Sequence, residues 1–174
     1  MIARSRYVFS CGLAVIVSCV AAAGVAAEPQ SLTGKVVAVA DGDTLTVLDD
    51  DKVQHKVRLH GIDAPERRQP FGTKARARLA ELTHGKSVRV LPVDRDKYGR
   101  TVARIEVEGQ DVSRQMVAEG LAWHYTRYSK DAAMAEAERE ARAAGRGLWA
   151  DREPVPPWEW RASEKERKRK PVTR

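Results

Sequence analysis

Hydrophobic and polar residues alternate along three short stretches near the start of the chain. The stretches are rich in Val, Leu and Thr, as strands are, and they cover residues 32–40, 44–48 and 52–60. Asp41-Gly42 separates the first two, and this dipeptide between apolar runs is a strong signal for a tight turn. The pattern therefore predicts an antiparallel meander of three strands.

The hydrophobic period lengthens after residue 72. Ala75, Leu79 and Leu82 recur at helical spacing and Gly85 follows them, which predicts a helix over residues 73–84. Alternating patterns then predict two more strands, and alanine-rich or capped patterns predict two more helices. These strands cover 87–91 and 100–107, and these helices cover 111–119 and 131–144.

Five short strands with a helix between the third and the fourth fit a small closed Greek-key barrel of the OB type. The predicted class is α+β, mainly β, and residues 28–160 are expected to form this one domain. Pro154, Pro156 and Pro157 interrupt regular structure, and Trp158 and Trp160 could dock the segment back onto the domain. No internal repeat is visible.

The first 27 residues have the layout of a secretory signal peptide. Arg4 and Arg6 precede an apolar run, and Val25-Ala26-Ala27 supplies small residues before a polar chain begins. We expect cleavage near Ala27 and a secreted or periplasmic protein with no membrane span after cleavage. Two alternatives rank below it: an uncleaved membrane anchor, and a lipoprotein signal that leaves Cys19 lipidated.

The net charge of +7 is not carried by the expected domain. The segment 1–27 carries two arginines and no acid, and the segment 161–174 carries seven basic and two acidic residues. The remaining residues hold 22 basic and 22 acidic side chains. We expect the segment 161–174 to be a disordered basic tail that attracts nucleic acid or anionic surfaces without sequence preference.

The segment 57–66 contains several side chains that could take part in catalysis or bind a metal ion. Arg58 lies on the third predicted strand, and Asp63 and Glu66 lie on the turn that follows it. Two further segments carry similar groups, at 41–44 and 96–100. Each segment taken alone has a structural interpretation, as a turn, a cap or an ion pair. Together, carboxylates and arginines suit phosphodiester hydrolysis, because carboxylates bind a hard cation or activate water and arginines neutralise phosphate.

The three segments form a recognisable set of motifs. They read Asp41-Gly42-Asp43-Thr44, Arg58-Leu59-x-x-x-Asp63-x-Pro65-Glu66 and Asp96-Lys97-Tyr98-Gly99-Arg100. In order and spacing this set resembles the motifs of the thermonuclease family, the staphylococcal-nuclease-like calcium-dependent nucleases. The resemblance covers about residues 33–150. It implies an OB-fold barrel with three helices that cleaves DNA and RNA and leaves 3′-phosphate ends.

The resemblance also implies roles for individual residues. The expected catalytic residues are Glu66 as general base and Arg58 and Arg100 as phosphate clamps. The expected Ca²⁺ ligands are the Asp43 and Asp63 carboxylates and the backbone carbonyl of Ala64. The expected nucleotide contacts are Tyr98, Tyr125 and Tyr128.

One residue departs from the family pattern. The best-known members have threonine at the position of Ala64, so a backbone ligand survives here but a hydroxyl contact to the metal's water is lost. The expected partners are DNA and RNA with little sequence specificity, and the expected state is a monomer. The alternative is a non-catalytic OB module that binds nucleic acid or protein. Such relatives typically lose the carboxylates or arginines that this chain keeps.

Overall fold

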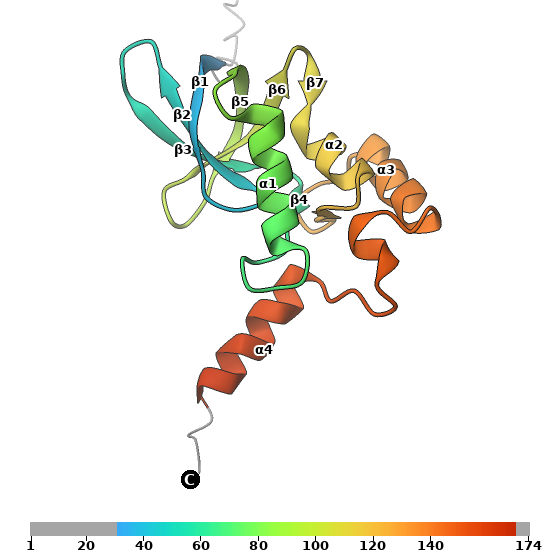
Figure 1. Cartoon of the computed structure of the whole chain (residues 1–174). Helices are drawn as coiled ribbons and strands as arrows, with labels where there is room; N and C mark the ends of the chain where they lie inside the picture. Colours follow the sequence, from blue (N-terminus) through green and yellow to red (C-terminus); the bar gives the residue numbers. More distant parts are fainter. Residues whose placement is uncertain (1–30, 170–174) are drawn as a thin grey trace, which may run out of the picture.

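The structure is a computed structural model that describes residues 31–169 (Figure 1). The expected signal peptide and the last five residues lie outside this range. The strands are β1 (Leu32–Val39), β2 (Thr44–Asp49), β3 (Gln54–Leu59), β4 (Ile62–Asp63), β5 (Ser87–Arg95), β6 (Thr101–Val107), β7 (Gln110–Asp111) and β8 (Trp123–His124). The helices are α1 (Gly72–Thr83), α2 (Val112–Ala118), α3 (Ala132–Ala143), the 3-10 helix η1 (Gly147–Ala150) and α4 (Pro157–Arg169).

Strands β1, β2, β3, β5 and β6 close into a five-stranded barrel. The sheet order is β3-β2-β1-β5-β6-β7, and a further parallel pairing of β3 with β6 joins its ends. The expected OB-type α+β fold and its opening antiparallel meander are therefore confirmed. The closure has a local consequence, because the pairing of Arg58 with Val102 brings the end of β3 beside the start of β6.

Apolar side chains from the inward faces of the strands fill the barrel. Val36, Leu45, Val57 and Ile105 are completely buried, as strand alternation predicts for one face of each strand. Helix α1 adds Ala75 and Leu79 to the same core cluster. In Figure 1 this helix lies against the barrel and descends towards the loop that follows β4.

Strand β5 is longer than the sequence pattern indicates. The expected strand ended at residue 91, but β5 continues through Pro92 to Arg95. Proline cannot donate a ladder hydrogen bond, and its position coincides with a register shift between Pro92 and Asp94 against β6. The bulge absorbs the proline, and the longer strand carries the charged loop 96–100 outwards.

The three expected helices are confirmed, and each of their boundaries differs by one residue from the expected one. Asp111 caps α2 by accepting a hydrogen bond from the Arg114 amide at 3.1 Å, and Asp131 caps α3 in the same way. Within residues 31–169, no helix is long and apolar enough to cross a membrane.

The expectation of disorder from Arg161 onward is wrong for residues 161–169, which form most of α4. Pro157, whose φ suits a first helical position, starts the helix and is buried. Trp158 stacks on Tyr125 with ring centroids 5.1 Å apart, so the expected docking of this tryptophan is confirmed. Beyond this first turn α4 projects away from the barrel (Figure 1), and its polar composition on all sides is what suggested disorder.

Candidate active site

The turn between β1 and β2 delivers the first two carboxylates of the site. Asp41 accepts a hydrogen bond from the Asp43 amide at 3.2 Å, which fixes the turn. Gly42 lies so close to the rest of the fold that an added Cβ would stand 2.7 Å from the Ala64 Cβ and 2.8 Å from the Ala75 Cβ. A glycine and two alanines therefore let the turn pack directly between the 62–66 segment and α1.

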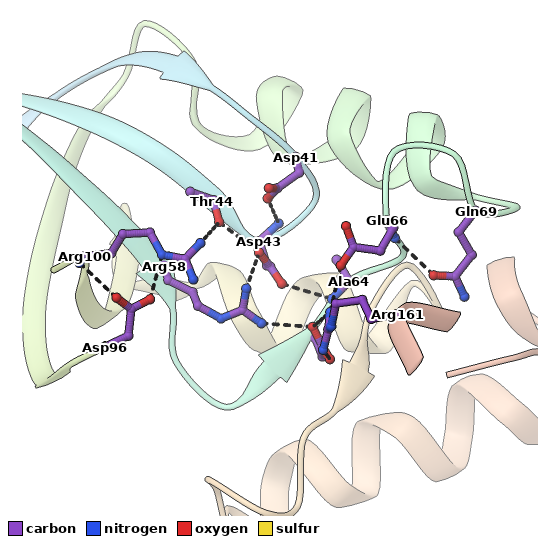
Figure 2. A network of polar contacts seen from close by, with 11 residues as sticks. Asp41, Asp43, Thr44, Arg58, Ala64, Glu66, Gln69, Asp96, Arg100 and Arg161 are labelled. Carbon is purple, nitrogen blue, oxygen red and sulfur yellow. Dashed lines mark hydrogen bonds and ion pairs between the residues drawn. The ribbon is translucent and has the colours of Figure 1, made fainter. Parts of the chain in front are cut away.

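Asp43 is buried at the centre of a polar network (Figure 2). It accepts hydrogen bonds from Arg58 at 2.9 Å, from the Thr44 hydroxyl at 3.0 Å and from the Ala64 amide at 3.2 Å. Burial raises the pKa of Asp43 to about 7, with Asp41 and Asp63 adding to the shift and Arg58 opposing it. The carboxylate therefore lies where additional positive charge would be stabilising.

Arg58 joins the two acidic segments. Its Nη1 donates to Asp43 and its Nη2 donates to Asp63, both at 2.9 Å. Burial on its own would lower the pKa of Arg58, but the two carboxylates outweigh that effect and raise it. The guanidinium therefore stays charged at the base of the site.

A small second sheet positions Asp63. Strand β4 pairs with β8, and Asp63 lies opposite Trp123 in this pairing. The Asp63 side chain is fully buried, and hydrogen bonds connect it to Arg58 and Arg161. The expected metal ligands Asp43 and Asp63 are thus held close together by one arginine.

Glu66 stands at the rim of the same cleft. Its amide donates to the Gln69 side chain at 3.1 Å, and Gln69 in turn donates to the Val155 carbonyl at 2.6 Å. The Glu66 side chain remains 42% exposed and ion-pairs with Arg161. Its position is fixed through the backbone while its carboxylate faces the open cleft.

Arg161 is a residue of the candidate site that the sequence patterns do not reveal. It reaches from α4 and donates to both Asp63 oxygens, at 2.7 and 3.2 Å, and to Glu66 at 2.8 Å (Figure 2). Burial would lower its pKa, but the hydrogen bonds to Asp63 and Glu66 outweigh this and raise it. The sequence around Arg161 is a basic run and does not indicate this contact, because Arg161 and Asp63 are 98 positions apart in the chain. Asp41 also lines the cleft, and only its presence in the first motif could have indicated this.

Arg100 enters from the opposite side, just before β6. Its Nε donates to Asp96 at 2.6 Å and its Nη1 donates to the Thr44 hydroxyl at 3.3 Å. Burial would raise the pKa of Asp96, but hydrogen bonds from Arg100 and from the Tyr98 amide outweigh it and lower the pKa. Asp96 thereby orients Arg100 towards the Asp43 network.

Three tyrosines border the cleft at different exposures. Tyr98 is 73% exposed beside Arg100, with that guanidinium 5.7 Å from its ring centre. Tyr128 is 61% exposed and packs edge-on against Tyr125 at 4.9 Å. One face of Tyr125 is covered by Trp158. Tyr98 and Tyr128 therefore offer the more accessible rings.

The cleft has a volume of about 780 Å³. Of the nine residues expected from the sequence to form the site, eight line it, and the ninth, Asp63, lies buried beneath it and is bonded to Arg58. The eight are Asp43, Arg58, Ala64, Glu66, Tyr98, Arg100, Tyr125 and Tyr128.

The donor set of the cleft fits a hard divalent cation. Asp43 and Asp63 supply carboxylate oxygens, and the raised pKa of Asp43 marks a place that favours added positive charge. The guanidinium of Arg161 forms ion pairs with the carboxylates of both Asp63 and Glu66. Within residues 31–169, no group of three or more His, Cys or acidic side chains surrounds a common point. The backbone and water would therefore complete the coordination.

The protein is a closed five-stranded OB barrel in which arginines and carboxylates meet in one cleft. The family model described as "Staphylococcal nuclease homologue" matches residues 56–151, more than half of the chain. The chain belongs to this family, which confirms the expected resemblance.

The chain is also similar in sequence to proteins from bacteria and plants. An "Uncharacterized endonuclease" from Haemophilus influenzae is 42% identical over 140 residues, covering 80% of this chain and 79% of the relative. One of the same name from Escherichia coli O157:H7 is 43% identical over 129 residues, covering 74% and 84%. A "Probable staphylococcal-like nuclease" from Oryza sativa subsp. japonica is 44% identical over 108 residues, which is 62% of this chain but 33% of that longer protein.

Proposed function

We propose that the protein is an exported Ca²⁺-dependent endonuclease that hydrolyses phosphodiester bonds of DNA and RNA and leaves 3′-phosphate ends. The observation that carries the proposal is the convergence of Arg58 and Arg100 with Asp43, Asp63 and Glu66 at one cleft. Membership of the nuclease homologue family and the names of the bacterial relatives support it.

The two arginines bind the scissile phosphate. Each guanidinium offers planar paired donors that match phosphate oxygens, and each side chain is only 20% exposed. Asp43 and Asp63 hold the Arg58 guanidinium in place before substrate binds. Asp96 does the same for Arg100. The donors are therefore in place where negative charge grows during the reaction.

Glu66 is the proposed general base. Water adds to phosphorus and its proton passes to the Glu66 carboxylate, while the bond from phosphorus to the 5′ oxygen breaks and that oxygen takes up a proton from solvent. The products are a 3′-phosphate and a 5′-hydroxyl. Gln69 holds the Glu66 backbone, so the carboxylate can exchange Arg161 for water without moving the loop.

Asp43, Asp63 and the Ala64 carbonyl are the residues that would hold Ca²⁺. Bound there, the ion would supply charge stabilisation at the phosphate and polarise water. Because Ala64 lacks a hydroxyl, its only polar contribution comes from the backbone. Its amide already contacts Asp43, so the two segments are held together without the cation.

Tyr98, Tyr125 and Tyr128 are the proposed nucleotide contacts. Stacking on an aromatic face tolerates every base, and the cleft residues that carry charge address phosphate. We therefore propose cleavage with at most a mild preference for regions where bases unstack easily. The proposed monomeric state can be checked by light scattering of the purified protein.

Export rests on the pattern of residues 1–27. N-terminal sequencing of protein recovered from the periplasm or medium should begin near Glu28. An intact Met1 would contradict cleavage, and a lipid on Cys19 would show the lipoprotein alternative.

The decisive experiment incubates purified residues 28–174 with plasmid DNA and with RNA. Cleavage is expected with Ca²⁺ and not with EDTA, and the new 3′ ends should resist extension by a polymerase until a phosphatase has removed the phosphate. Arg58→Gln should abolish cleavage, while Arg104→Gln is a matched control, because Arg104 is 47% exposed and pairs with Asp131 outside the cleft. An intact plasmid with Ca²⁺, Mg²⁺ or Mn²⁺ would instead indicate the non-catalytic binding module.

A further inference from the structure

A second, basic groove continues from the active-site cleft. It has a volume of about 590 Å³ and lies between α4 and the loop that follows Glu66. Glu66 and Arg161 line both the groove and the cleft, so the two are contiguous. The cationic and aromatic residues of the groove are Arg67, Arg68, Trp160, Arg161, Lys165 and Lys168.

The cations on α4 form a stripe that leads away from the cleft. Arg161, Lys165 and Lys168 are spaced at i, i+4 and i+7, so they lie on one face of the helix. At about 1.5 Å per residue, Lys168 stands roughly 10 Å further along the axis than Arg161. Arg67 and Arg68 line the other wall of the groove.

The groove keeps a surplus of positive charge. Within residues 31–169, none of Arg67, Arg68, Lys165 and Lys168 forms an ion pair, whereas both glutamates of the groove are engaged. Glu66 pairs with Arg161 at 2.8 Å and Glu164 pairs with Arg167 at 2.5 Å. Four cations around one groove, none of them paired within the described residues, favour the binding of a polyanion.

Trp160 adds an aromatic surface to this groove. Its ring is partly exposed and makes no ring–ring contact within the described part of the chain, unlike Trp158 on the same helix, which stacks on Tyr125. Unpaired cations beside an available aromatic ring are the combination with which proteins hold single-stranded nucleic acid. An anionic lipid surface could bind the cations, but such binding would not explain why the groove is continuous with the active-site cleft.

We propose that this groove is a second binding site for the substrate strand, in which Lys165 and Lys168 bind phosphates beyond the scissile bond and Trp160 stacks on a base. The proposal rests on the proposed nuclease function. The α4 wall of the groove lies beyond the segment matched by the family model, which ends at residue 151, whereas Arg67 and Arg68 on the other wall lie within that segment. Its contribution is to hold long strands, and short substrates cannot reach it.

The test compares a single-stranded tetranucleotide with a 20-mer, using the full mature chain. Lys165→Gln/Lys168→Gln is expected to lower the ratio of kcat/KM for the 20-mer to that for the tetranucleotide about tenfold. The slope of log Kd for the 20-mer against log salt, measured by fluorescence anisotropy in EDTA, should fall by about 1.4, or 0.7 for each lost phosphate contact. Trp160→Leu should weaken 20-mer binding with the salt slope unchanged.

Lys56→Gln/Lys86→Gln is the matched control, because both lysines are exposed and line neither the groove nor the cleft. An unchanged ratio and slope in the groove variant, or an equal change in the control, would overturn the proposal. Loss of binding to phosphatidylserine vesicles with 20-mer binding intact would assign the groove to membranes and also overturn it. If the wild type cleaves neither substrate, the proposed nuclease function fails, while the anisotropy measurements still decide the groove.

Discussion

Replacing Arg161 by glutamine should tighten Ca²⁺ binding. Arg161 Nη2 donates to the Asp63 Oδ2 atom at 2.7 Å, and Nη1 donates to Asp63 Oδ1 and to Glu66. The same Asp63 carboxylate is the proposed metal ligand. We expect a cation at Asp63 to compete with the guanidinium for these carboxylate oxygens, so that Arg161 acts as an internal competitor carried by α4.

The size of the effect follows from the exposure of the two partners. Asp63 is fully buried, but Arg161 is 42% exposed. Breaking a buried pair costs about 3–5 kcal/mol and an exposed pair contributes at most about 1 kcal/mol. A half-exposed pair lies between these limits, at about 1–2 kcal/mol, which corresponds to roughly a 5–30-fold lower Kd for Ca²⁺.

Calorimetric titration of Ca²⁺ into the mature chain measures this Kd without turnover, and the Ca²⁺ activation curve of plasmid cleavage gives a second measurement. Arg167→Gln is the control, because Arg167 lies on the same helix and pairs with Glu164 rather than with a carboxylate of the cleft. A higher or unchanged Kd for Arg161→Gln, together with a lower kcat, would refute the reasoning. Arg161 would then contact the substrate phosphate rather than compete with the metal.

Two further predictions concern the site and two concern the stability of the fold. Glu66→Gln should keep Ca²⁺ and substrate binding but lower kcat about 10²–10⁴-fold; recovery of the wild-type rate at saturating Ca²⁺ would make Glu66 a ligand instead. Arg100→Lys should have a much lower kcat/KM than the wild type, because an ammonium lacks paired planar donors. Gly42→Ala should destabilise the fold by about 1–3 kcal/mol, measured by urea unfolding, because its Cβ would stand only 2.7 Å from another Cβ. Arg78→Gln should cost about 1 kcal/mol at pH 7, and because Arg78 holds the pKa of Glu119 below its usual value, this difference should persist above pH ~4.5 and vanish as pH falls through that lowered pKa.

The elements whose causes are local could be predicted from the sequence. Alternation and the Asp41-Gly42 turn predicted the opening meander, and Asp111 and Asp131 marked the starts of two helices that they do cap. These signals work because turns, caps and periodicity depend on neighbours a few residues apart. The residue types of the site were also apparent, since eight of the residues that line the cleft, six of them within the three motif segments, and Asp63 beneath it could be named from the sequence.

The way in which those groups meet depends on contacts between distant parts of the chain. Closure of the barrel through β3 and β6 brings Arg58 beside the start of the strand that follows Arg100, and the pairing of β4 with β8 buries Asp63. Helix α4 is the clearest case, because its polar residues from Arg161 onward favour disorder when considered alone. Its first turn docks through Pro157 and Trp158, and Arg161 finds two carboxylates that lie 98 and 95 positions earlier. No local pattern encodes such a contact, because its stabilisation depends on groups that only the folded chain brings within hydrogen-bond distance.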